Sequence, residues 1–300
     1  MELRHLDALL AIDRYRSFTA AADALHTVQS NVSDMVRQLE TELGVVLLVR
    51  GRRGAQPTEF GRVVLESARR IRAEIDALQQ DILMIQGLEV GRASLGVVGT
   101  ISRWLAPAVV KTVHDRSPGV LIRVHEGASE RLAVEVAEQT LAQAIVTEPV
   151  LDSRLHVEHL LDEDLVVLVP TSTTDIGEGP LPLSALAGHN LILPPFGNPL
   201  RAEVDLASSH AGVELLVQIE VEGVRLIPDL VAAGVGITVI PETAVPADTP
   251  GVRAIALADM PPRRLALVTA RGGYLSIADQ AVRDAVIELV RTQRPGGNVS

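Results

Sequence analysis

The chain has 300 residues, of which 47% are apolar and 22% charged; this predicts two or three folded domains and excludes wholesale disorder and fibrous repeats. It contains no cysteine, which excludes disulfide scaffolds, thiolate metal sites and thiol nucleophiles. No apolar run reaches the ~18 residues that a membrane span requires, and the N-terminus lacks the basic-then-apolar order of a signal peptide. We therefore expect a cytoplasmic protein with no membrane partner.

The net charge of −11 is unevenly distributed along the chain. Residues 1–87 hold 11 arginines against 12 acidic residues, whereas residues 88–300 hold 16 basic and 26 acidic residues. Within the first part, the stretch from Arg50 to Arg72 carries seven arginines and only two acidic residues. A basic cluster in an acidic protein predicts that this stretch, and not the remainder, contacts a polyanion.

The first 45 residues indicate three short helices. Apolar spacing predicts one helix ending near residues 14–16 and a second over residues 19–25, with Ser17 as its N-cap. After a turn at residues 26–29, a third helix is expected to end at Gly44. Its two faces differ, because four apolar residues recur at helical spacing on one side: Val32, Val36, Leu39 and Leu43.

The opposite face of the third helix is polar. Two helices joined by a turn, the second apolar inside and polar outside, are what a DNA-reading helix-turn-helix requires, since the polar side chains stay free to reach base edges in the major groove. These side chains are Gln29, Ser30, Ser33 and Arg37. A hairpin over residues 45–58 would follow and would carry three arginines toward the DNA backbone or minor groove: Arg50, Arg52 and Arg53.

Residues 58–86 form the clearest periodic pattern in the sequence. Eight positions at alternating spacings of three and four are apolar or glycine: Gly61, Val64, Ala68, Ile71, Ile75, Leu78, Ile82 and Ile85. This is a heptad seam, which predicts a helix that pairs with a second copy of the chain. We expect the dimer interface to include Ile71, Ile75, Leu78 and Ile82.

Residues 1–60 resemble the winged helix-turn-helix domain of LysR-type transcriptional regulators. The resemblance rests on these stretches: 17–22 (SFTAAA), 25–26 (LH), Gln29, Ser33, 37–40 (RQLE), 42–44 (ELG), Leu47, Arg50 and 58–61 (TEFG). Three positions depart from the family pattern, and one of them is Leu48, which replaces the usual Phe. Val28 stands where the family has Ser, so Thr27 is expected to cap the third helix instead, and Asp34 places a negative charge near the phosphates.

The resemblance extends over the whole chain and implies a sequence-specific transcriptional regulator without enzymatic activity or cofactor. It implies double-stranded DNA as a partner, at an inverted repeat, and a homodimer or homotetramer; RNA polymerase is a further partner that it allows. It adds two residues to the DNA-binding set, Ser17 and Thr19. A small-molecule effector, with a carboxylate as one option, is expected to switch the regulator.

After residue 91, predicted strands and helices alternate, which implies parallel sheets covered by helices. Among these elements are strands over residues 93–98, 144–146 and 165–169 and a helix over residues 224–233. The fold class is α/β, with a winged helix-turn-helix head (1–60), a linker helix (58–87) and an effector domain (91–300) similar to type 2 periplasmic-binding proteins. The effector domain is divided into two parts. Subdomain I is expected to comprise residues 91–162 and 270–292, and subdomain II residues 163–269.

In open α/β folds a ligand binds outside the carboxyl ends of strands, near helix N-termini. This rule selects the expected effector-binding residues: Thr100, Ile101, Ser102, Ser129, Thr147, Phe196, Arg201, Gly223 and Val224. The hydroxyls of Ser102 and Ser129 are expected to cap their own helices more often than they contact a ligand. Three arginines are candidates to pair with a ligand carboxylate: Arg103, Arg201 and Arg225. Three glutamates expected at the same site oppose this: Glu126, Glu148 and Glu222.

Other functional classes are weaker. A metal site at His156 and His159 is disfavoured, because residues three apart on a strand face opposite sides and no third ligand is evident. A DNA-binding head fused to a pyridoxal-phosphate enzyme would need a Schiff-base lysine, and the one lysine, Lys111, lies in a predicted packing helix. A solute-binding domain with an accessory head, or a non-specific architectural protein, would fit the chain less well.

Overall fold

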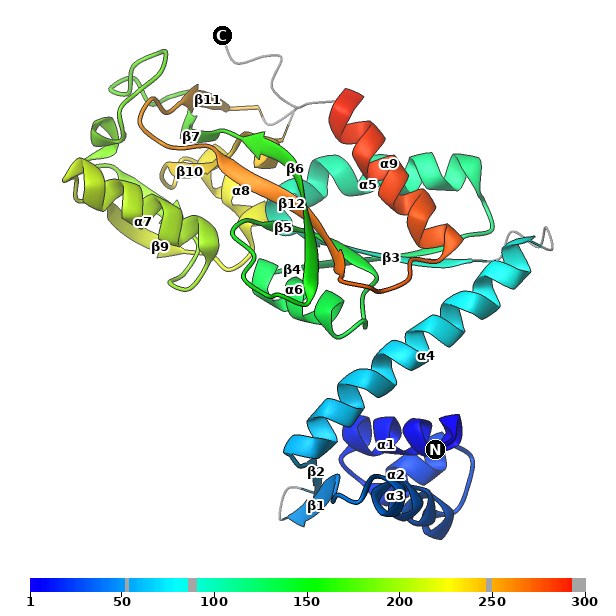
Figure 1. Cartoon of the computed structure of the whole chain (residues 1–300). Helices are drawn as coiled ribbons and strands as arrows, with labels where there is room; N and C mark the ends of the chain where they lie inside the picture. Colours follow the sequence, from blue (N-terminus) through cyan, green and yellow to red (C-terminus); the bar gives the residue numbers. More distant parts are fainter. Residues whose placement is uncertain (52–53, 86–90, 247–249, 293–300) are drawn as a thin grey trace. The chain divides into compact units, whose positions relative to one another are not determined.

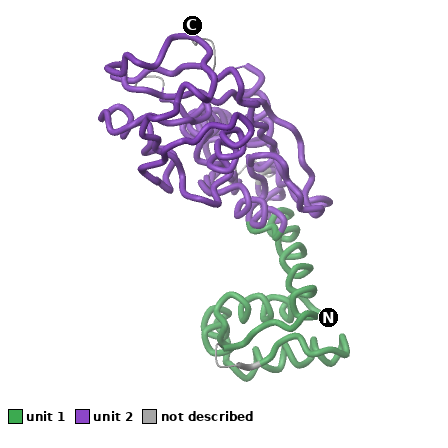
Figure 2. Tube along the Cα trace, turned by 90° about the vertical axis from the view of Figure 1, so that its left-hand side faces the viewer, with its two compact units in different colours: residues 1–78, 138–140 green, residues 79–137, 141–300 purple. Residues whose placement is uncertain are grey.

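The computed structural model describes residues 1–51, 54–85, 91–246 and 250–292 (Figure 1). The chain divides into two compact units, one of residues 1–78 with 138–140 and one of residues 79–137 with 141–300 (Figure 2). We call them the DNA-binding unit and the effector unit. Among the described residues, none of the helices combines the length and the apolar content needed to span a bilayer.

The DNA-binding unit consists of helices and one hairpin. Its elements are α1 (Leu3–Tyr15), α2 (Phe18–Ala24), α3 (Gln29–Leu43), β1 (Leu48–Gly51), β2 (Gly54–Pro57) and the long α4 (Glu59–Ile85), which continues past the boundary of the unit. One apolar core joins all of them, with Leu9, Ile12, Val32, Leu39 and Leu47 fully buried. The expected face of α3 is confirmed at three of its four positions, whereas Leu43 in its last turn is 41% exposed.

Two close approaches fix the hairpin against the helices. Glu40 on α3 accepts hydrogen bonds from the backbone of Leu47 (2.7 Å) and Leu48 (3.2 Å), which positions β1. Gly61 lies so near this strand that a Cβ atom would stand 2.1 Å from the carbonyl oxygen of Leu47. Only glycine fits there, and this explains the small residue at the start of the apolar pattern of α4.

The effector unit contains three sheets. Its first half comprises β3 (Arg92–Val98), α5 (Gly99–Arg116), β4 (Leu121–Gly127), α6 (Ser129–Ala137), β5 (Gln143–Thr147) and β6 (Leu155–Glu163). After β7 (Leu165–Pro170) follow β8 (Asn190–Leu193), α7 (Pro199–Ala211), β9 (Leu216–Glu220), the 3-10 turn η2 (Val224–Leu226), α8 (Ile227–Ala232), β10 (Thr238–Pro241) and β11 (Val252–Ala256). The unit ends with β12 (Arg263–Ala270) and α9 (Ile277–Thr292).

Two hydrophobic cores correspond to the two subdomains. The larger sheet has the order β4-β3-β5-β12-β6, with α5 and α9 on one face and α6 on the other (Figure 1). The second core lies around the sheet β10-β7-β11 and the strand pair β8-β9. The chain passes from the first sheet to the second between Glu163 and Leu165, near the expected position.

The return to the first subdomain differs from our expectation. We placed residues up to 269 in subdomain II, but β12 begins at Arg263 and pairs with both β5 and β6 in the first sheet. These pairs are antiparallel, as are those of β7 with β10 and β11. The larger sheet is therefore mixed, since β3 runs parallel to β4 and β5, whereas the sheet β10-β7-β11 is antiparallel and the pair β8-β9 is parallel.

Two local assignments were also wrong. The expected helix over residues 224–233 is split into η2 and the short α8, where Pro228 lies in the first turn of the new helix. Strand β11 was not predicted at all. Four of its five residues are half-buried and Ile255 is buried, so burial does not alternate along it, and it pairs with β7 over its whole length.

Candidate DNA-binding and effector sites

The polar face of α3 is exposed. Gln29, Ser30 and Arg37 face solvent and Ser33 is half-buried, while the apolar face of the same helix lies in the core. The Arg37 guanidinium lies 3.2 Å from the carboxylate of Asp34, one turn earlier. Asp34 therefore partly neutralises the longest cationic side chain on this face and does not stand alone as a negative charge.

Ser17 and Thr27 were both expected to cap helices. Ser17 does so, because its hydroxyl accepts a hydrogen bond from the backbone of Ala20 (3.3 Å) at the start of α2. Thr27 does not: its hydroxyl accepts from the side chain of Asn31 (2.9 Å), and α3 begins after Val28 without a side-chain cap in the described structure. The first-turn N–H groups of α3 thus have no competing side chain and suit a phosphate oxygen.

The remaining DNA-binding candidates lie on α2 and the hairpin. Thr19 is exposed in the first turn of α2. Arg50 is on β1, where its backbone pairs with Ala55 in the register that brings Gly51 opposite Gly54. Arg52 and Arg53 lie outside the described residues. The β1–β2 pairing thus confirms a hairpin within residues 45–58.

The apolar stripe of α4 is divided into two parts. Gly61 and Ala68 are buried within the DNA-binding unit, so this part of the seam cannot serve a partner. Further along, Ile75 is half-buried, whereas Ile71, Leu78 and Ile82 are exposed by 36%, 58% and 47%. The seam available for pairing is therefore shorter than the eight predicted positions.

The hydroxyl groups expected to face an effector are buried, together with the core residue Ile101. Ser102 donates to the carbonyl oxygen of Gly99 in its own helix (3.0 Å), and Ser129 accepts from the backbone N–H of Thr147 (3.0 Å). Neither serine caps its helix, so that expectation was wrong. The hydrogen bond of Ser129 instead links the start of α6 to the end of β5.

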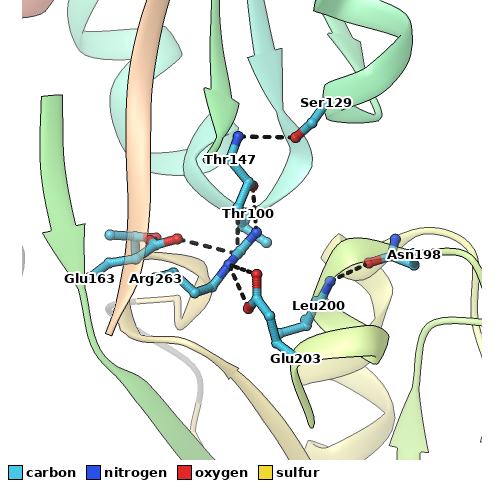
Figure 3. Close-up of polar contacts among 9 residues, drawn as sticks. Thr100, Ser129, Thr147, Glu163, Asn198, Leu200, Glu203 and Arg263 are labelled. Atoms are coloured by element: carbon cyan, nitrogen blue, oxygen red, sulfur yellow. Dashed lines mark hydrogen bonds and ion pairs between the residues drawn. The ribbon is translucent and has the colours of Figure 1, made fainter. Parts of the chain in front are cut away.

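Arg263 is the residue that sequence reasoning missed. Its guanidinium donates to the hydroxyls of Thr147 (2.7 Å) and Thr100 (3.4 Å) and lies 3.2 Å from the carboxylate of Glu163 (Figure 3). On another side, its Nε atom is 3.0 Å from the carboxylate of Glu203 on α7. Two predicted effector residues thus converge on an internal cation that comes from the start of β12.

This arginine cluster joins both subdomains. Arg263 and Glu163 have side chains exposed by only 4% and 1%, and Thr243 donates its hydroxyl to the same Glu163 carboxylate. Burial raises the pKa of Glu163 and of Glu203, although the Arg263 charge opposes the shift. A sequence signal for the cluster was weak, because its members are scattered from residue 100 to residue 263.

Arg201 is also committed to internal partners. It is buried, its Nε atom donates to Asp205 (3.0 Å) and its Nη1 atom to Glu220 (3.0 Å). Phe196, which is 76% exposed, lies against the guanidinium at 4.0 Å. We considered Arg201 a ligand partner or a solvated side chain, and the structure places it in neither role, because α7 and β9 each direct a carboxylate at it.

A further ion pair links the two subdomains. Arg225, in the η2 turn that begins after Gly223 with Val224, lies 3.2 Å from Glu126 at the end of β4. Arg103 donates to the backbone carbonyl of Arg225 (3.4 Å). The contacts across the subdomain boundary thus join elements that we expected around one ligand site: α5, β4 and η2.

The histidine pair that we disfavoured as a metal site lies on β6. His159 contacts the carboxylate of Glu148 through Nδ1 (3.0 Å), and Arg264 approaches the same carboxylate (3.4 Å). Within the described ranges, no group of three or more histidine, aspartate and glutamate side chains is arranged to hold a metal ion. Glu148 therefore belongs to a surface ion network.

Comparison with known proteins agrees with this organisation. Residues 3–62 match the bacterial regulatory helix-turn-helix protein, lysR family, and residues 86–291 match the LysR substrate binding domain. A probable hydrogen peroxide-inducible genes activator from Streptomyces viridosporus is 30% identical over 96% of this chain and 97% of its own length.

Solved structures share the fold. A full-length OxyR variant from Pseudomonas aeruginosa has a TM-score of 0.74 at 21% identity and covers 97% of this chain and 95% of its own. Full-length CbnR complexed with its target DNA has a TM-score of 0.66 at 22% identity, over 97% and 99%. The two matched domains occupy most of the sequence in the order that the structure shows. The chain belongs to the LysR family of bacterial transcriptional regulators.

Proposed function

We propose that this chain binds an inverted-repeat operator as a homodimer or homotetramer, without enzymatic activity. The observation that carries the proposal is α3, whose apolar face is buried while Gln29, Ser30 and Arg37 remain exposed. Such side chains read base edges in the major groove, and arginines of the hairpin would add contacts to phosphates. The structure of CbnR with its target DNA supports the same docking mode by similarity of fold.

Selection of genomic fragments by the purified protein, followed by footprinting, tests this proposal. We expect one enriched inverted repeat, and a log–log decrease of affinity with salt that reflects several phosphate contacts. A Ser30→Ala, Arg37→Ala double variant should lose the enrichment but keep residual salt-dependent binding. Equal enrichment by the variant would remove α3 as the reading element.

Several relatives are named for induction by hydrogen peroxide, but this chain lacks the group that thiol-based peroxide sensing needs. Reversible sensing through sulfenic acid or disulfide formation requires a thiol. The chain contains no cysteine. We therefore propose that its signal is a bound small molecule.

The effector is proposed to bind near Thr100, Ser102, Ser129 and Thr147, at the edge where β3 and β5 end. Arg201, Arg225 and Arg263 are each paired with a carboxylate, so they do not offer a free charge to a ligand. Arg103 is exposed on the first turns of α5, and no carboxylate of the described residues contacts it. This favours an effector with at most one carboxylate, which Arg103 would neutralise.

Thermal-shift screening of metabolites tests the effector proposal. A ligand should raise the melting temperature of the wild type and should do so less for Arg103→Ala. Ser102→Ala tests the contribution of a hydroxyl that already serves its own helix. If ligands stabilise all three proteins equally, the site lies elsewhere.

An enzymatic role is not supported by the one lysine. Lys111 is on α5 with its side chain 75% exposed, and it pairs with Asp115 one turn later. A Schiff-base lysine is normally desolvated or placed beside another cation so that its amine loses its proton. Nothing around Lys111 provides either condition, which supports a regulator over a pyridoxal-phosphate enzyme.

A further inference from the structure

A pocket of about 610 Å³ opens beside the arginine cluster, and its lining contains Arg263 but none of the proposed effector residues. One wall is a face of α7, and the opposite wall is the segment that leads from subdomain II into β12. Its lining includes Glu203, Leu206, Ala207, Leu165, Met260 and Pro262. Pockets of about 300–1,000 Å³ with mainly apolar walls and a few polar groups are the usual form of small-molecule sites.

Most of the lining is apolar. Leu206, although it lines the pocket, is 58% exposed, and Leu165 is buried at the floor. A leucine of this exposure on a helix face is covered when an apolar molecule fills the pocket, which removes its surface from water. The occupant should therefore present an apolar body of about one or two rings.

The charges around the pocket are unbalanced. One guanidinium, that of Arg263, faces two carboxylates, Glu163 and Glu203. Of the two, Glu163 also accepts from Thr243, whereas both carboxylate oxygens of Glu203 lie against the Arg263 Nε atom, at 3.3 and 3.0 Å, and the Glu203 side chain is 30% exposed. A half-buried carboxylate that shares one guanidinium with a second carboxylate favours a further cationic donor in its vicinity.

Other charged groups at the pocket leave this excess in place, and the remaining ionisable lining residue, His210, is exposed on α7. Glu148 is paired with Arg264, so the two cancel. Asp259 accepts from the backbone N–H of Leu183 with both oxygens (2.8 and 3.0 Å) and adds a second negative charge at the rim. An anionic ligand would meet this negative potential, whereas an ammonium group would be attracted.

We propose that this pocket is a second small-molecule site, distinct from the effector site, and that it binds an apolar amine whose ammonium group pairs with Glu203. The apolar body would lie between Leu206 and Met260. Since Glu203 also holds Arg263, which donates to Thr100 and Thr147, a bound amine would act on the strand that connects the two subdomains.

Three indole compounds of matched size test the proposal: tryptamine, tryptophol and indole-3-propionate. Binding to the full chain is followed by NMR of ¹³C-methyl methionine, because Met260 lines the pocket and Met35 on α3 serves as an internal reference. We expect tryptamine to shift the Met260 signal and leave Met35 unchanged. Its affinity should exceed that of indole-3-propionate by at least about tenfold, which corresponds to about 1.4 kcal/mol.

Two variants complete the test. Glu203→Gln should lower the affinity for tryptamine to that for tryptophol, and Ala207→Trp should fill the pocket and abolish binding. Ala202→Trp is the matched control, because Ala202 is exposed on the same helix and does not line the pocket. Circular dichroism establishes that each variant is folded, and Leu206→Glu replaces Ala207→Trp if the latter is not.

Three outcomes would overturn the proposal. Equal binding of the amine and the carboxylate would remove the charge argument. Retained binding in folded Ala207→Trp or Leu206→Glu would place the ligand elsewhere. A change in the sedimenting mass of these variants, but not of Ala202→Trp, would identify the pocket as a contact between chains. None of these outcomes bears on DNA binding, so the proposed function stands or fails separately.

Discussion

Helix α3 and the Arg263 cluster use polar side chains in opposite ways. On α3 they lie on the outer face of a helix whose inner face is buried, and they remain exposed to an external partner. In the effector unit, Thr100, Thr147 and Arg263 are buried, and both threonine hydroxyls accept hydrogen bonds from Arg263. The first arrangement recognises something outside the chain, whereas the second stabilises the junction of two subdomains.

This difference teaches that a polar residue at a helix start or strand end is not by itself a ligand contact. All five hydroxyl and guanidinium groups in the expected effector-binding set already have partners inside the protein. Ser129 and Arg201 are examples, since each bonds to an element that is distant in sequence.

Arg263→Met should have the largest effect. It leaves Glu163 and Glu203 buried without their cation, and breaking a buried ion pair on one side costs about 3–5 kcal/mol. Urea unfolding of the variant measures the loss. Arg264→Met, the neighbouring exposed arginine, is the control and should cost about 0–1 kcal/mol. Similar losses in both would show that the buried cluster contributes no more than a surface pair.

Leu78→Asp tests the exposed part of the α4 seam. If this residue lies in a dimer interface, the substitution buries an unpaired charge and should cost about 3 kcal/mol of association free energy. Sedimentation should then show a smaller species that binds half-sites poorly. Leu83→Asp makes the same change on the same helix, outside the heptad positions, and should leave the oligomer intact. An unchanged mass for Leu78→Asp would mean that other contacts hold the assembly.

Arg37→Ala should weaken operator binding by about 1–3 kcal/mol and relax the sequence preference at one base pair. Asp34→Asn should act in the opposite direction, because it frees the guanidinium from a carboxylate 3.2 Å away. The gain should be below about 1 kcal/mol, since exposed pairs are weak. Fluorescence anisotropy on operator and scrambled DNA over a range of salt concentrations measures both. A weaker Asp34→Asn complex would contradict a neutralising role for Asp34.

Glu203 predicts a pH dependence confined to the effector unit. Burial raises its pKa above the ordinary 4.5 in the folded chain, so the folded state binds more protons than the unfolded state just above that pH. Stability contributed by this group is therefore complete below about pH 4.5 and is lost as the pH rises through the folded pKa. The unfolding free energy of Glu203→Gln, relative to the wild type, should accordingly improve as the pH rises. A difference independent of pH would contradict the assignment.

Much of the fold was predictable because it depends on local patterns. Helical spacing gave α1, α3 and α4 within a few residues, and short apolar runs gave β3, β5 and β7. Ser17 was predictable as a cap, since the interaction spans three residues. The helix-turn-helix and its polar face belong to this class, because one amphipathic helix contains both the packing face and the reading face.

Tertiary structure decided what depends on distant partners. The place of β12 in the first sheet follows from its pairing with β5 and β6, more than 100 residues earlier. The role of Arg263 follows from four groups that only the folded subdomains bring together, and Gly61 is required only because Leu47 approaches it. A side chain's own sequence neighbourhood specifies its helix or strand. Its partner depends on how the helices and strands pack. Therefore only the tertiary structure showed that the polar groups of α3 are exposed and those of the Arg263 cluster are buried.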